Sequence, residues 1–246
     1  LVDVALGGNA NVLDILLGSV AVNYIDNEVV TMDQEKQADE TGFNILKNTE
    51  YNVGGAASSM QYVYEQYGDL WQEGFKRVIS PNNHPQMSSR IQKLAGRMSQ
   101  WSGNHVQVGG NTVYVNAQPV VTPAAMGSYS SRRRAFLVAG NLARSFHDVY
   151  GEAPKDNKVL TETINKKDPS WNISTQGDEL YLNGQYIMTG TAGDSVTRIA
   201  SNLQRAVDSK SAMLSKGDIQ QKDKEWTQKY GYKATKENQV KKDKDA

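Results

Sequence analysis

Apolar side chains in the first hundred residues recur at the spacing of α-helices. The pattern predicts a buried helix over residues 12–20, a second helix from residue 31 or 33 to Lys47, and a third over residues 56–67. A turn at residues 52–55 separates the second helix from the third. The apolar positions of the first helix are Val12, Leu13, Leu16, Leu17 and Val20, and those of the third are Ala56, Met60, Val63, Tyr64 and Tyr67. Both sets describe faces that pack into a core.

A fourth helix is predicted to follow Pro85. Proline suits the first position of a helix, because its missing N–H would have no partner there in any case. Apolar residues then mark a buried face up to Trp101, and Ser102-Gly103 ends the helix. The first hundred residues are therefore predicted to be mainly helical.

After Gly103 the pattern changes to short β-rich runs. Residues 114–122 and 181–189 parallel one another, and each run precedes a helix that carries Asn-Leu-x-Arg. Asn183-Gly184, between alternating apolar residues, is the strongest local signal for a β-hairpin, because both turn residues must accept positive φ. Ala117, at the position of Gly184, makes the first hairpin a weaker prediction. The region is predicted to contain two units, each a β-hairpin and a helix.

Together these patterns predict an α+β protein. Residues 1–103 form a helical region, residues 104–212 an α+β module with the hairpin-and-helix repeat, and residues 213–246 a charged tail. The tail mixes Lys, Asp and Gln with little apolar periodicity, so we expect it to be partly ordered or to form an exposed helix. We expect few contacts between residues 10–101 and 105–210 compared with contacts inside each region.

The composition changes this picture little. The chain of 246 residues is 38% hydrophobic, enough for real cores, and its 27 basic residues balance its 27 acidic ones. This balance gives no global field for nucleic acid or an anionic membrane, so no nucleic-acid partner is expected. The longest apolar run, residues 12–25, is too short and too polar for a transmembrane segment. The chain has no cysteine, which excludes disulfides, thiol catalysis and cysteine metal sites.

Two carboxylates in the second predicted helix are candidates for chemistry. Glu35 and Asp39 lie four residues apart, so both project from one face of the helix, one turn from each other. Two anions at this spacing repel, and the pair is easier to explain if a cation or a histidine N–H lies between them. The spacing alone is weak, because a Glu-x-x-x-Asp match occurs by chance about once in a chain of this size.

The order of motifs around this pair makes it more informative. Glu35-x-x-Ala-Asp39 is followed by Gly42 and then by Asn83-His84-Pro85 and Arg90. This order resembles the second half of the catalytic domain in the HtpX and CAAX prenyl protease family of zinc metallopeptidases, over about residues 10–101. The resemblance implies a zinc cofactor, a peptide or protein substrate, and hydrolysis of peptide bonds by metal-activated water.

The resemblance also implies roles for individual residues. Glu35 would be the third zinc ligand, after two histidines, and Asp39 would orient a ligand histidine through a hydrogen bond. His84 and Arg90 would lie at the rim of the metal cleft. Without the resemblance, the preferred interpretation of His84 is a loop histidine that hydrogen-bonds the backbone, and with the resemblance the two interpretations stand level.

One part of the family pattern is missing. The H-E-x-x-H motif, which would supply two ligands and the general base, occurs nowhere, and the chain contains only His84, His105 and His147. We assign no chemistry to His105 and His147. We expect the motif to lie upstream in the complete protein, of which this chain is a processed or truncated piece that is inactive alone. The alternative is a non-catalytic pseudopeptidase or interaction protein that kept the scaffold.

The module of residues 104–212 offers one more candidate. Arg132-Arg133-Arg134 begins a predicted helix, where positive charge opposes the helix dipole. The run is explained either by an anionic partner or by a solvated charged surface. A protein partner for the module would accompany the non-catalytic function. We expect an extracytoplasmic location, in the periplasm or at the cell envelope, with which the absence of cysteine is compatible.

Overall fold

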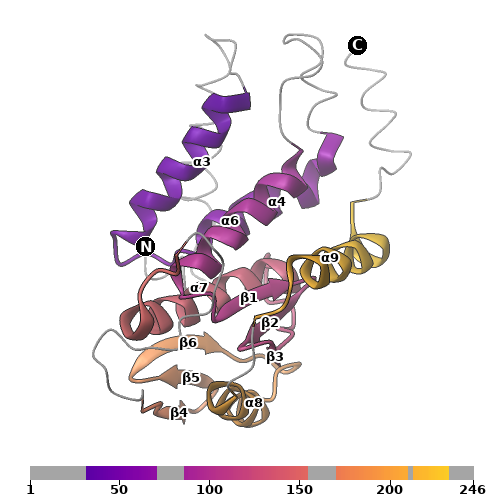
Figure 1. Cartoon of the computed structure of the whole chain (residues 1–246). Helices are drawn as coiled ribbons and strands as arrows, with labels where there is room; N and C mark the ends of the chain where they lie inside the picture. Colours follow the sequence, from indigo (N-terminus) through magenta and orange to yellow (C-terminus); the bar gives the residue numbers. More distant parts are fainter. Residues whose placement is uncertain (1–31, 71–85, 155–169, 210–212, 233–246) are drawn as a thin grey trace.

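The computed structural model describes residues 32–70, 86–154, 170–209 and 213–232 (Figure 1). These residues form six α-helices and two three-stranded antiparallel sheets, which confirms the predicted α+β class. The helix predicted over residues 12–20 lies outside the described residues.

The α-helices described in the N-terminal region lie where its sequence pattern predicts them. They are α3 (Met32–Lys47), α4 (Gly55–Tyr67) and α6 (Met87–Trp101), and the short 3-10 helix η1 (Gly68–Leu70) follows α4. Gly68, at φ 64°, ends α4, and Gly103, at φ 70°, follows the end of α6. Pro85, predicted to open α6, lies outside the described residues.

Two units of the same topology follow α6. The first consists of β1 (Val106–Gly109), β2 (Thr112–Val115), β3 (Gln118–Val121) and α7 (Ser131–Tyr150). The second consists of β4 (Ile173–Gln176), β5 (Glu179–Leu182), β6 (Gln185–Thr189) and α8 (Val196–Asp208). In each sheet the strands lie in chain order and pair antiparallel. The predicted hairpins join β2 to β3 and β5 to β6, and β1 or β4 adds a third strand to each.

The two sheets match in register as well as in order. In both, the register of the central strand shifts just before a tyrosine, Tyr114 in β2 and Tyr181 in β5. The turn that follows has an asparagine at positive φ and then Ala117 at 62° or Gly184 at 77°. The repeat in the sequence is therefore also a repeat in the structure.

Ala117 occupies a left-handed turn position that suits glycine. The left-handed conformation costs a residue with a Cβ about 1–2 kcal/mol, and glycine avoids this steric cost. Glycine in turn loses more backbone entropy on folding, because it is more flexible in the unfolded chain. We therefore expect Ala117→Gly to raise the free energy of unfolding by about 1 kcal/mol, measured by urea denaturation. Gly184→Ala, the matched control, should lower it by a similar amount. Equal stability of Ala117→Gly and the parent would contradict strain at this turn.

Each helix of the repeat is hydrogen-bonded to the sheet of the other unit. The side-chain amide of Asn141 on α7 donates to the carbonyl oxygen of Ile187 in β6 at 2.9 Å. That of Asn202 on α8 donates to the carbonyl oxygen of Val120 in β3 at 3.0 Å. Because β3 and β6 are edge strands, these amides satisfy main-chain groups that the sheet leaves unpaired. This contact explains the asparagine of the repeated Asn-Leu-x-Arg sequence.

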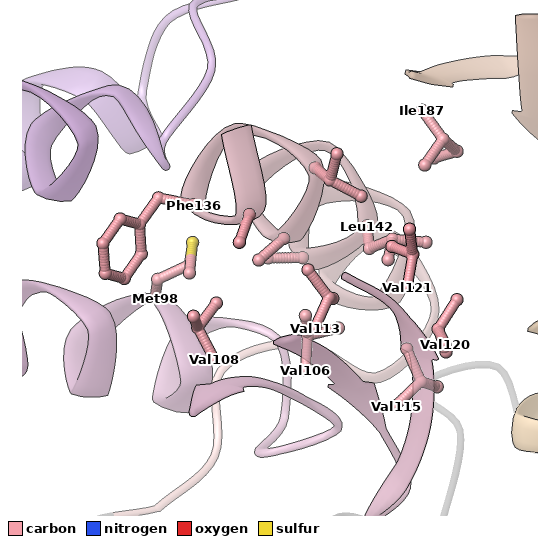
Figure 2. Packing of buried hydrophobic residues seen from close by; sticks show 14 of the residues in the cluster. Met98, Val106, Val108, Val113, Val115, Val120, Val121, Phe136, Leu142 and Ile187 are labelled. Carbon is pink, nitrogen blue, oxygen red and sulfur yellow. The ribbon is translucent and has the colours of Figure 1, made fainter. Parts of the chain in front are cut away.

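One hydrophobic core joins the helical region to the two units. Helix α7 packs against α4 and α6 and also against strands of both sheets. Figure 2 shows Met98 of α6 close to Phe136 of α7 and Val108 of β1, and Ile187 of β6 belongs to the same cluster. The expected scarcity of contacts across residue 103 is therefore not observed. The reason is that α7 needs apolar cover on the face that the sheets leave open.

The arginine run at the start of α7 is buried, so its interpretation as a solvated charged surface is wrong. Arg132, Arg133 and Arg134 are 6%, 4% and 5% exposed. Successive residues of a helix point about 100° apart, so each guanidinium reaches a different part of the molecule. The run joins three elements to α7.

Arg133 and Arg134 contact elements on two sides of α7. The guanidinium of Arg133 lies 4.6 Å from the ring centroid of Tyr62 and 4.4 Å from that of Tyr129. Arg134 forms an ion pair of 2.8 Å with Asp194, just before α8. Burial by itself would raise the pKa of Asp194, but hydrogen bonds from a backbone N–H and from Arg134, with the charge of Arg134, outweigh it and lower that pKa.

Arg132 anchors the C-terminal helix α9 (Lys216–Tyr230). Its guanidinium lies 3.0 Å from Oδ1 of Asp223 and 4.3 Å from the ring centroid of Trp226. The same Asp223 oxygen accepts the N–H of Gly110, in the turn between β1 and β2, at 3.0 Å. Asp223 and Trp226 are both buried. This part of the charged tail is therefore a helix with one anchored face.

Candidate functional site

Glu35 and Asp39 lie one turn apart on α3, and Arg90, in the first turn of α6, reaches both of them. Nε and Nη2 of Arg90 donate to the two carboxylate oxygens of Asp39 at 2.9 and 2.7 Å. Nη1 lies 3.6 Å from Oε2 of Glu35. The side chains of Arg90, Glu35 and Asp39 are 16%, 17% and 11% exposed. They form a mostly buried cluster that joins two motifs far apart in the sequence.

Arg90 supplies the cation that two carboxylates at this spacing require. Burial by itself would lower the pKa of Arg90, but the hydrogen bond to Asp39 and the charges of Asp39 and Glu35 outweigh it and raise that pKa. The bidentate contact with Asp39 is the strongest geometry for an arginine–carboxylate pair. A second ion pair, between Arg97 and Glu40, joins the same two helices nearer the surface.

Asp69 of η1 holds the N-terminus of α6. Its Oδ1 accepts the N–H of Ser88 at 2.8 Å, and its Oδ2 accepts the hydroxyl of Ser88 at 3.0 Å. The first N–H groups of a helix have no partner inside it, so a carboxylate there is stabilising. Because Ser88 lies two residues before Arg90, this cap fixes the turn that carries Arg90. The sequence did not predict the role of Asp69, because Asp69 and Ser88 are 19 residues apart and no local pattern connects them.

The described residues offer one candidate zinc ligand rather than a complete site. No group of three or more His, Cys, Asp or Glu side chains that could hold a metal occurs among them. Both oxygens of Asp39 accept from Arg90, whereas Glu35 meets it through a longer contact of 3.6 Å. Zinc takes three or four protein ligands, and a glutamate carboxylate is one of the groups that can bind it. His84 lies outside the described residues.

The other two histidines contribute to packing around α7. His105 is buried, its Nδ1 lies 2.6 Å from Oδ1 of Asn116, and its ring stacks on that of Tyr150 with centroids 4.0 Å apart. Nδ1 of His147 lies 2.8 Å from the carbonyl oxygen of Trp101, and the two rings stack at 4.2 Å. These contacts connect α7 to the end of α6 and to the first sheet.

Comparison with known proteins finds no relative: no family model, curated protein or solved structure matches the chain. The candidate site is therefore defined by its own geometry, with Arg90 between Glu35 and Asp39. Across the described ranges, every helix is too short or too polar to cross a membrane.

Proposed function

We propose that this chain is part of a zinc-dependent metalloendopeptidase in which Glu35 provides one ligand of the metal. The observation that carries the proposal is the contact of Arg90 with Glu35 and Asp39. Only the resemblance to the HtpX and CAAX prenyl protease family pairs the Glu-x-x-Ala-Asp motif with the His-Pro-x-x-x-x-Arg motif. A chance match of two motifs gives no reason for their charged residues to meet in the folded chain.

The residues of the cluster have different parts in this function. Bound zinc would activate a water molecule for attack on a peptide carbonyl. Glu35 would bind the metal through a carboxylate oxygen. Each oxygen of Asp39 has a second lone pair beyond the contact with Arg90, so Asp39 is able to accept the N–H of a ligand histidine and hold its ring. Arg90 is a positioning residue that fixes the orientation of Asp39.

The remaining elements of the function belong to the same proposal. The H-E-x-x-H motif would lie upstream and supply two histidine ligands and the general base. His84 would lie at the rim of the cleft. The substrate would be a peptide or protein, and the enzyme would act outside the cytoplasm.

The alternative is a non-catalytic pseudopeptidase or interaction protein that kept this scaffold. Charge balance favours it, because Arg90 already neutralises the repulsion between Glu35 and Asp39 and the pair needs no metal to be stable. In that case the upstream sequence lacks H-E-x-x-H, and residues 104–212 bind a protein partner. The upstream sequence of the gene separates the two functions.

The test compares three carboxylate variants in the chain extended by its natural upstream sequence. Glu35→Gln should lose bound zinc and casein hydrolysis, because a neutral amide is a poor zinc ligand. Asp39→Asn should retain zinc in excess metal and hydrolyse casein about 10 to 100-fold more slowly, the usual effect of changing a hydrogen bond to a metal ligand. Glu40→Gln, the matched control on the same helix, should retain both properties, since Glu40 pairs with Arg97.

Zinc is measured by metal analysis of dialysed protein, beside casein hydrolysis at equal protein concentration. Full zinc content and full activity in Glu35→Gln would overturn the proposal and leave the cluster as a structural ion pair. Loss of zinc in Glu40→Gln as well would attribute the effect to unfolding of α3 rather than to ligand chemistry.

A further inference from the structure

The two helices that carry Asn-Leu-x-Arg differ in what covers them. On α7, the segment between α3 and α4 lies across this sequence. Nη2 of Arg144 donates to the carbonyl oxygens of Thr49 and Tyr51 at 2.8 and 2.7 Å. The side-chain amide of Asn52 donates to Oδ1 of Asn141 at 2.8 Å. This face of α7 therefore binds a polypeptide segment through its main-chain carbonyls and a side-chain N–H.

On α8, the corresponding face is exposed at Arg198, Ser201 and Arg205. Asn202 and Arg205 stand at the positions of Asn141 and Arg144, and with Arg198 they line a shallow, open surface along α8, the α8 groove. Arg198 and Arg205 are exposed. Arg205 donates to Oδ1 of Asn202 at 2.6 Å, and no carboxylate among the described residues pairs with Arg198. Within the described residues, the module thus repeats on α8 a face that binds polypeptide on α7, and Arg205 there has no main-chain carbonyl partner.

The charge of the α8 groove differs from that of the covered face. One turn before the asparagine, α7 has Leu137 and α8 has Arg198. The residues that line the α8 groove are two arginines and neutral polar residues, with no carboxylate. A partner that fits this groove brings negative charge and oxygen acceptors for the two guanidinium groups.

We propose that the α8 groove binds an acidic polypeptide segment of a partner protein. Carboxylates of the segment pair with Arg198 and Arg205, in the way that main-chain carbonyl oxygens pair with Arg144 on α7. Oδ1 of Asn202 accepts an N–H of the segment, in the way that Oδ1 of Asn141 accepts one from Asn52. In Figure 1, α8 lies at the end of the molecule opposite to α3. The inference is therefore independent of the peptidase proposal.

Nucleic acid, the other polyanion that two arginines could contact, fits the groove less well. Proteins that bind single strands supply aromatic side chains on which bases stack, and no aromatic residue lines this groove. Binding to a phosphate backbone also relies on extended positive charge, and the chain has no net charge. An acidic peptide needs only the local complementarity that Arg198 and Arg205 provide.

The test titrates the 15N-labelled chain with a poly-glutamate peptide of about 15 residues, with poly-glutamine of equal length as the neutral control. Amide signals of Arg198, Ser201, Asn202 and Arg205 should shift with poly-glutamate and stay in place with poly-glutamine. The double variant Arg198→Ala/Arg205→Ala should bind about fivefold more weakly, as expected for the loss of two surface ion pairs. Lys216→Ala/Lys224→Ala, which removes two exposed charges from α9, is the matched control and should bind like the parent.

Charge reversal keeps the test decisive if the alanine variant is destabilised. Arg198→Glu/Arg205→Glu should lose poly-glutamate and gain binding of poly-lysine at the same residues. Shifts spread over other basic residues, or equal binding by the parent and the double alanine variant, would overturn the proposal. Binding of a 15-nucleotide single strand or of phosphatidylglycerol vesicles at this groove, without binding of the peptide, would overturn it as well.

Discussion

Gly140→Ala is expected to lower the free energy of unfolding by about 3 kcal/mol, the upper part of the range for overpacked cores. A Cβ at this position would lie 1.9 Å from Oδ1 of Asn52 and 2.4 Å from the backbone nitrogen of Gly54. Backbone atoms cannot rotate away, and Asn52 is held by hydrogen bonds to Asn141 and to the carbonyl oxygen of Leu137. Helix α4 must therefore move away from α7, which opens the core that the two helices share.

The matched control is Gly96→Ala on α6. Nothing outside its own helix lies within 4 Å of the Cβ position of Gly96, so alanine should raise stability by about 0.5–1 kcal/mol through its better helix propensity. Urea denaturation of both variants and the parent measures the two effects. A Gly140→Ala variant as stable as the parent would contradict a tight crossing of α4 and α7.

Asp223→Ala is expected to cost about 3–5 kcal/mol, because it removes one partner of a buried ion pair and leaves the other charged. Burial lowers the pKa of Arg132, and the charge of Asp223 opposes this effect more than any other neighbour does. The N–H of Gly110 loses its acceptor as well. With these contacts gone, α9 has only Trp226 among its buried side chains to hold it against the first unit.

Hydrogen exchange of the α9 amides and thermal denaturation measure the two consequences separately. The amides should exchange faster in Asp223→Ala, and the midpoint of unfolding should fall. Glu225→Ala, two residues along the same helix at an exposed position, is the control and should change neither. A loss of stability under 1 kcal/mol in Asp223→Ala would indicate that Arg132 finds another partner.

The features that the sequence predicts well are those set by neighbours in the chain. The helical spacing of apolar residues located α4 and α6, because each buries one face against a core. Asn183-Gly184 located the second hairpin, because its backbone conformation is a property of the two residues themselves. The spacing of Glu35 and Asp39 also placed both carboxylates together on one face of α3.

The features that the sequence did not predict depend on residues far apart in the chain. The arginine run has no local signal for its partners, since Asp223 and Asp194 come from segments that only the fold brings to α7. The contact between Arg90 and Asp39 also joins residues that are far apart in the chain. The resemblance suggested that Arg90 lies near the cleft, but its hydrogen bonds follow from the way α3 packs on α6. Local patterns locate the helix on which a charged residue lies, but they do not identify its ion-pair partner.

The reciprocal hydrogen bonds of Asn141 and Asn202 have a consequence for the assembly of the repeat. The helix of each unit donates a hydrogen bond to the edge strand of the other unit. This reciprocal arrangement is the one found in a two-fold symmetric dimer. Here both halves belong to one polypeptide. Two separate identical subunits would have to carry the same outer helix surface, and joined ones need not. The difference between Leu137 on α7 and Arg198 on α8 is an asymmetry that only the covalently joined form allows.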